Sequence, residues 1–378
     1  MTNNTLSATV GSIHTSQSTP PKGNNTMNNT TVSSTTTNNR NSFMNNTTAA
    51  NLDSEVENLV NSTNVTSAVR DLVLRKWNEL RNQKLNILIT GATGCGKSST
   101  INALFNMGAA NSVEVATVGT GPDPETMEIA KYEIGNMTLW DSPGLGDGKT
   151  ADERHARNIV KKLNERDHKG NLLIDLVLVI LDGSTRDLGT SYELINNVII
   201  PNLGENKEQR ILVAINQADA AMNGRHWDYE RNCPDAKLVE FLDEKCESVR
   251  RRIYDGTSVD IAPIYYSAGY KEEGKAQERP YNLAKLLYFI LRHLPEEKRL
   301  VAVKNTNTDT RMWEHNDRDD YREKSSKLTA NGVMSWMGIG TALGATFGSL
   351  FPGIGTAVGG AVGGLLGAGI GLLTSLFG

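Results

Sequence analysis

Residues 85–105 read LNILITGATGCGKSSTINALF, and this stretch decides the fold. An apolar run of strand length passes through a glycine-rich turn into a segment with helical character. The turn, residues 91–98, matches the pattern G-x-x-x-x-G-K-[ST], in which glycines let backbone N–H groups converge on phosphate oxygens. Lys97 would reach the outer phosphates of a nucleotide, and Ser98 would bind Mg²⁺. The predicted nucleotide contacts in this stretch are Gly91, Thr93, Gly94, Cys95, Gly96, Lys97, Ser98 and Ser99.

Strand and helix patterns alternate along the rest of residues 84–295. Residues 174–181, IDLVLVIL, form a continuous apolar run that is typical of a central parallel strand. Gly135-Asn136 lies between two short strand-like stretches and predicts a hairpin. Residues 66–82 carry apolar side chains at helical spacing. The alternation predicts an α/β fold with a doubly wound sheet that contains one hairpin.

The bulk composition excludes several classes of protein. A net charge of −4 and a pI of about 5.9 give no global signal for nucleic-acid binding. The N-terminus lacks a basic start followed by an apolar core, so we expect no secretory signal. The cysteines are few and odd in number, without the paired spacing of a metal site, which fits a reducing, cytoplasmic compartment. They are Cys95, Cys233 and Cys246.

Composition also divides the chain. Residues 1–50 are mostly Asn, Thr and Ser, and we expect them to be disordered because they hold too little apolar surface to fold. We expect residues 51–83 to form a helical segment that precedes the main domain, and residues 84–295 to form that domain. Residues 296–327 are charged and polar, which predicts a linker or, from residue 300 on, a peripheral helix. Residues 328–378 contain no charged side chain.

A second motif, Asp141-Ser142-Pro143-Gly144, follows the second strand of the predicted hairpin. Asp141 is placed to hold Mg²⁺ through water. The backbone N–H of Gly144 could meet the last phosphate of a triphosphate and reorganise the loop that follows. A lone D-x-P-G sequence is a common turn, but after a phosphate loop it indicates a nucleotide-sensing segment.

Two further motifs are placed to contact the base of the nucleotide. Asn216-Gln217-Ala218-Asp219 follows the strand-like RILVAI. A carboxylate at Asp219 accepts hydrogen bonds from N1–H and the exocyclic amine of guanine, which adenine cannot offer, and such pairs discriminate by roughly 10⁴ or more. Ser267-Ala268-Gly269 follows IAPIYY, and its backbone N–H groups could meet the guanine O6.

These four motifs, in this order on these strands, resemble the Era-like, translation-factor type of small GTPases, a group of bacterial G-domain proteins that includes ribosome-binding members. The resemblance covers about residues 84–295. It implies a P-loop NTPase G domain with a mostly parallel six-stranded sheet. It also implies binding of GTP and GDP with Mg²⁺, and slow hydrolysis of GTP coupled to a conformational switch.

The chain departs from the family pattern at three positions. Gln217 stands where the family usually has Lys, which weakens packing beside the base while Asp219 keeps the specificity. Leu145 stands where some GTPases carry the Gln that orients the attacking water. Gly94 stands where some relatives use Asn to hold potassium. We therefore assign no catalytic group.

The threonine that completes the Mg²⁺ site in such proteins precedes the hairpin. Thr117, Thr120 and Thr126 are the candidates, and the room needed for a full hairpin before Asp141 favours Thr120. The predicted metal ligands are therefore Ser98, Thr120 and Asp141. His155, His168 and His226 show no partner pattern, and we expect surface or packing roles for them.

The charge-free tail carries glycine at every fourth position, before and after Pro352-Gly353. In water such a helix would be unstable, at up to about 1 kcal/mol per glycine relative to alanine. In lipid, a glycine stripe allows close helix contact, and residues 354–377 are long enough to span about 30 Å. Residues 333–378 therefore predict a helical hairpin in or across a membrane. The alternative is a soluble hairpin packed on the G domain or on another subunit of an oligomer.

Two hypotheses of function follow. In the first, a Mg²⁺-dependent GTPase on the cytoplasmic face of a membrane switches the state of its tail. In the second, a membrane-active scaffold or pore binds GTP without significant turnover to control its assembly. A ribosome- or RNA-binding role rests on the family resemblance alone, since no basic domain follows residue 295. An ATPase would require Asp219 to be uninvolved with the base.

Overall fold

The computed structural model describes residues 67–105, 128–146, 148–271, 277–307 and 309–336, together with residues 57 and 61. The predicted disordered start, Thr120 and the tail beyond Trp336 lie outside the described residues.

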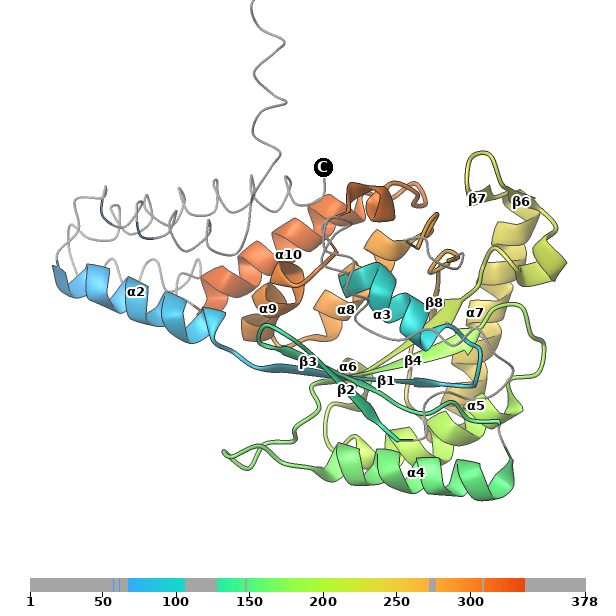
Figure 1. Ribbon diagram of the computed structural model, residues 1–378, viewed down its shortest axis with the longest axis horizontal. Helices are drawn as coiled ribbons and strands as arrows, with labels where there is room; N and C mark the ends of the chain where they lie inside the picture. The colour runs from blue at the N-terminus through green and yellow to red at the C-terminus, as the bar shows by residue number, and fades with distance from the viewer. Residues whose placement is uncertain are drawn as a thin grey trace, which may run out of the picture. The chain divides into compact units, whose positions relative to one another are not determined.

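A six-stranded sheet with the order β2-β3-β1-β4-β5-β8 forms the centre of the fold (Figure 1). Its strands are β1 (Leu85–Gly91), β2 (Ala130–Ile134), β3 (Met137–Asp141), β4 (Leu176–Asp182), β5 (Ile211–Asn216) and β8 (Ile264–Tyr265). Every neighbouring pair is parallel except β2 and β3, which form the hairpin predicted at Gly135-Asn136. The predicted doubly wound, mostly parallel sheet is confirmed.

Helices connect the strands and cover both faces of the sheet. The regular helices are α2 (Ser67–Arg81), α3 (Lys97–Phe105), α4 (Lys149–Asn164), α5 (Gly189–Glu193), α6 (Lys207–Arg210), α7 (Ala236–Thr257), α8 (Leu283–His293), α9 (Arg299–Lys304) and α10 (Tyr321–Trp336). A π-helical turn, η2 (Leu194–Ile199), continues α5, and short 3₁₀ turns occur at η3 (Ile200–Asn202), η4 (Ala221–Gly224), η5 (Glu296–Lys298) and η6 (Thr310–Trp313). A separate small hairpin pairs β6 (Trp227–Asp228) with β7 (Cys233–Pro234).

The central strands are apolar on both faces because each face is covered. Along β4, Leu178 and Ile180 face the core shared with α3 and α8, while Val177 and Val179 face the core shared with α4 and α7. This alternation explains why residues 176–181 of β4 show no polar positions. Figure 1 shows α3, α8, α9 and α10 on one side of the sheet and α4 and α5 on the other.

Residues 296–327, expected from sequence to be a linker or a peripheral helix, carry η5, α9, η6 and the start of α10. Val301 and Trp313 are buried in the same core as β1 and β3, and the Trp313 indole N–H donates to the Asn307 carbonyl at 2.9 Å. Lys298 pairs with Asp175 at 2.6 Å. The buried apolar residues of this stretch lie at positions 300–303, 312–313 and 321, between longer charged and polar segments, so the overall charged composition conceals how firmly it packs.

Helix α10 runs into the charge-free segment that was expected to begin at residue 328. Val333 and Trp336 at its end pack beside Trp77, Leu80 and Leu300 of α2 and α9. The lead-in helix and the last described helix therefore share a small apolar cluster. Among the helices of the described ranges, none has both the length and the apolar character needed to cross a membrane.

Candidate nucleotide-binding site

The phosphate loop lies between the carboxyl end of β1 and the start of α3. The first N–H groups of a helix have no partner within it, and its dipole favours negative charge at this end. Gly96 has a φ of 88°, and a β-carbon there would lie 2.2 Å from Nδ2 of Asn216. The loop can approach the base-binding motif this closely only because glycine occupies this position.

Lys97 lies folded over the same loop. Its ammonium donates to the carbonyl oxygens of Gly91 at 3.2 Å and Ala92 at 3.1 Å. Phosphate oxygens would offer charge-assisted bonds, which are stronger than these bonds to neutral carbonyls. The side chain is therefore already held where a nucleotide's phosphates would be bound. Ser99 follows Lys97 and Ser98 in the first turn of α3 and is half-buried.

Asp141, at the end of β3, meets Ser98 in the first turn of α3. Asp141 is paired in register with Ile89 of β1, and its Oδ2 accepts a hydrogen bond from Ser98 Oγ at 3.3 Å. The carboxyl group is buried, and its other oxygen, Oδ1, has no partner. Burial raises the pKa of Asp141 to about 6, while the charge of Lys97 and the Ser98 hydrogen bond act in the opposite direction.

This pair fits a magnesium ion. An ion beside Asp141 would satisfy its unpartnered oxygen and favour the charged carboxylate. Mg²⁺ is commonly held by one or two protein oxygens together with substrate phosphates and waters. The described ranges contain no cluster of three or more His, Cys, Asp or Glu side chains that could hold a metal.

The D-x-P-G segment is packed directly on the phosphate loop. A β-carbon at Gly144 would lie 2.2 Å from Thr93 Oγ1, so glycine is required there. The backbone N–H of Thr93 donates to the Leu145 carbonyl at 2.9 Å. The Leu145 side chain is buried in the core that the sheet shares with α4 and α7, so it has neither the chemistry nor the position to orient water.

His155 contributes to this segment in a way that the sequence did not reveal. It is 2% exposed on α4, its Nδ1 lies 3.1 Å from the Gly144 carbonyl, and its Nε2 is buried without a partner. Its position far along the following helix gave no signal of this contact. The packing role expected for His155 thus extends to holding the backbone of the D-x-P-G segment.

The base-binding motifs are joined to the phosphate loop by Asn216. Its Nδ2 donates to the Cys95 carbonyl at 2.9 Å, and its Oδ1 accepts from the Ala268 N–H at 2.8 Å. Gln217 has a φ of 59°, and its side-chain amide donates to the Gly94 carbonyl at 2.8 Å. Asp219 follows two residues later and is half-buried.

The structure therefore brings all four motifs to the carboxyl end of the sheet. Cys95 is fully buried, and burial raises the pKa of its thiol, so its side chain fills space while its carbonyl accepts the Asn216 bond. Ser267 and Gly269 flank Ala268 in the turn that follows β8. Thr120 is the one predicted site residue that lies outside the described ranges.

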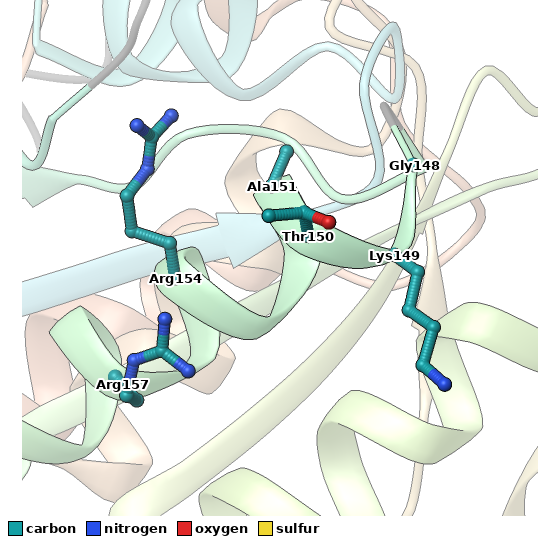
Figure 2. Close-up of a pocket in the computed structure, with 6 residues that line it drawn as sticks. All are labelled: Gly148, Lys149, Thr150, Ala151, Arg154 and Arg157. Carbon is teal, nitrogen blue, oxygen red and sulfur yellow. The ribbon is translucent and has the colours of Figure 1, made fainter.

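A basic groove borders this site at the start of α4. It has a volume of about 510 Å³ and is lined by Gly148, Lys149, Thr150, Ala151, Arg154 and Arg157 (Figure 2). Arg154 and Arg157 lie one turn apart, and Lys149 extends away from them (Figure 2). The helix follows the D-x-P-G segment closely in the chain, but the sequence pattern gave no indication of a groove at its start.

Comparison with known proteins points to GTPases over part of the chain. Residues 50–163 match the family described as interferon-inducible GTPase (IIGP). An uncharacterised Escherichia coli (strain K12) protein, YfjP, is 29% identical over 153 residues, covering 40% of this chain and 48% of YfjP. Mouse interferon-gamma-inducible GTPase 10 is 32% identical over 111 residues, covering 29% of this chain and 24% of the relative.

The chain thus spans about half, or less, of the length of these relatives. Among solved structures, Toc33 from Arabidopsis thaliana, crystallised with GDP and Mg²⁺, is similar with a TM-score of 0.37 and 17% identity, over 59% of this chain and 87% of Toc33. The IIGP match includes the phosphate loop and the D-x-P-G segment but ends before the base-binding motifs.

Proposed function

We propose that this chain binds GTP with Mg²⁺ and hydrolyses it to GDP and phosphate as a nucleotide-controlled switch. The observation that carries the proposal is the pair of hydrogen bonds made by Asn216, to Cys95 and to Ala268. They fix the phosphate loop, the Asp219 loop and the Ser267-Ala268-Gly269 turn in one arrangement. The order of the motifs further supports placing the chain among Era-like, translation-factor-type GTPases.

Each group has a role in this proposal. The phosphate loop and Lys97 bind the phosphates, Ser98 and Asp141 hold Mg²⁺ with Thr120, and Asp219 reads N1–H and the amine of guanine. Hydrolysis needs a group that orients water, and Leu145 cannot supply it. We expect slow intrinsic turnover that rises when a partner, a second copy of the chain or a cation supplies that group.

The charge-free tail is the basis for the second part of the proposal, which is association with the cytoplasmic face of a membrane. Residues 328–378 carry no charge and repeat glycine with helical spacing. The first of these residues lie on α10, which packs against α8 and α9 of the G domain. A helix shared by both parts gives nucleotide state a direct physical route to the tail.

Binding of GTP, ATP and XTP by the wild-type chain and by Asp219→Asn tests the base assignment. The wild type should prefer GTP over ATP, and the variant should prefer XTP, because the new amide donates to the 2-oxo group of xanthine. Lys97→Ala should weaken binding of all three nucleotides. Equal wild-type affinity for GTP and ATP would contradict the proposal.

Turnover measured with and without anionic liposomes tests the coupling. A variant that ends at Trp336 provides the control. Lipid-stimulated hydrolysis that is lost in the shortened variant supports the switch. Tight GTP binding without turnover in any condition, together with leakage from the liposomes, would instead support a scaffold or pore.

A further inference from the structure

The small β6–β7 hairpin lies in a segment that the proposed nucleotide site leaves unexplained. We define the insert as residues 221–235, which follow the Asp219 loop and lead into α7. Trp227 of β6 pairs with Pro234 of β7.

The insert is attached to the segment that follows the base-binding turn. Asn232 is 4% exposed with a φ of 53°, and its amide donates to the carbonyls of Arg279 and Pro280, at 3.1 Å each. The rings of Trp227 and Tyr281 meet edge to face with centroids 5.2 Å apart. The Arg279 guanidinium donates to the Tyr229 carbonyl. Because Asn232 is buried and bonds two backbone carbonyls, it holds the insert and the segment at residues 279–280 together.

The same segment holds the base-binding turn. Ser267 and Tyr281 exchange two backbone hydrogen bonds of 2.9 Å. Gly269 has a φ of 77°, and a β-carbon there would lie 2.0 Å from the Glu278 carbonyl oxygen. The buried Gln277 side chain donates to the Ala268 carbonyl. The contacts therefore run without interruption from the insert to the peptide that joins Ala268 and Gly269.

That peptide matters because recognition of O6 needs a backbone N–H. The Ala268 N–H already donates to Asn216 at 2.8 Å. The Gly269 N–H makes a longer bond to Ser267 Oγ, at 3.1 Å, and is the more readily available donor. In a planar trans peptide the C=O and N–H point in opposite directions, so fixing the Ala268 carbonyl also fixes the Gly269 N–H.

We propose that the insert is a clamp that sets recognition of the 6-oxo group of the purine, with Asn232 and Gln277 as positioning residues. The inference rests on the proposed guanine-nucleotide function. Asp219 reads the 2-amino edge of the base, and the clamp sets the geometry of the donor on the 6-oxo edge. The two loops that read the base are thereby held at a fixed separation.

Nucleotide analogues separate the two edges of the base. In 6-thio-GTP a weakly accepting sulfur replaces O6, and ITP lacks the 2-amino group. The test variants are Asn232→Gly, which removes the amide while tolerating the positive φ, and Gln277→Met, which removes a donor at similar volume. Asn206→Gly is the matched control, since Asn206 is exposed with a φ of 53° and makes no side-chain cap.

Equilibrium binding of GTP, 6-thio-GTP and ITP is then measured for all four proteins. Both test variants should lose about tenfold in GTP affinity, the effect of one lost hydrogen bond, and little in 6-thio-GTP affinity. The ratio of GTP affinity to ITP affinity should stay unchanged, because Asp219 reads the 2-amino group. Because ITP keeps O6, its affinity should fall in parallel with that of GTP. The control should match the wild type.

A uniform loss for all three nucleotides, or no loss, would overturn the clamp, since a merely structural insert would not distinguish the 6-position. Failure of the underlying function gives a different result, because the wild-type chain would then not prefer GTP over ATP. If Asn232→Gly fails to fold, Arg279→Met tests the insert in its place, because it removes the guanidinium bonds to the carbonyls of Tyr229 and Glu230 and keeps the Asn232 amide.

Discussion

At the scale of single residues, Gln217 shows how this chain departs from the usual base motif and still joins its loops. Its neutral amide donates to the Gly94 carbonyl at 2.8 Å, a bond that a lysine ammonium could also make. Gln217→Met should lower GTP affinity about fivefold to tenfold, the effect of one hydrogen bond, and Gln217→Lys should restore it. Calorimetric titration measures both, with the exposed Gln209→Met as control. Wild-type affinity in Gln217→Met would show that the bond does not support binding.

Asp141 gives a prediction about pH. Burial raises its pKa to about 6, whereas an unfolded aspartate titrates near 4. The protonated carboxyl therefore stabilises the folded state fully below about pH 4, and this contribution is lost as the pH rises through about 6. Without Mg²⁺, Asp141→Asn should raise the free energy of unfolding by about 2–3 kcal/mol at pH 7.5 and by less than half of that at pH 4.5.

Urea unfolding at the two pH values measures this difference. Saturating Mg²⁺ and GTP should reverse the order of stability at pH 7.5, because only the wild type keeps the carboxylate ligand. An equal difference at both pH values would show that Asp141 titrates normally in the folded chain.

At the scale of elements, η6 and α9 belong to the core that packs on the central sheet. Trp313 is fully buried beside residues of β1 and α8. Trp313→Ala should lower the free energy of unfolding by about 3–5 kcal/mol, as expected when a large aromatic side chain leaves a cavity. Denaturant unfolding checks this result, and the exposed neighbour Glu314→Ala should change stability by less than about 0.5 kcal/mol. Equal, small effects would restore the view of this stretch as a linker.

At the scale of the whole molecule, the site links four separate strands, so a bound nucleotide should stabilise the domain as one unit. A ligand at 100 times its Kd adds about 2.7 kcal/mol to the free energy of unfolding. GTP with Mg²⁺ should therefore raise the Tm by about 5–10 °C for a domain of roughly 200 residues, whereas ATP should not. Thermal scans of the wild type and Lys97→Ala provide the measurement. An equal rise in Lys97→Ala would place the nucleotide elsewhere.

The sequence by itself determined the α/β fold, the position of the hairpin and the strand ends at which the nucleotide motifs lie. It could do so because each depends on local pattern: apolar runs of strand length, a Gly-Asn turn, and polar motifs directly after a strand. Residues such as Lys97, Asp141 and Asp219 could be named because their chemistry is tied to short spacings within a single loop.

Only the tertiary structure decided the contacts between distant segments. Asn216 reaches Cys95 and Ala268, His155 reaches Gly144, and Asn232 reaches Pro280, each across a separation that no local periodicity encodes. The burial of Trp313 was hidden for the same reason, because a few apolar residues among many charges form a core only when the rest of the sheet is present. Packing, which depends on the whole chain, therefore decided how the motifs are joined.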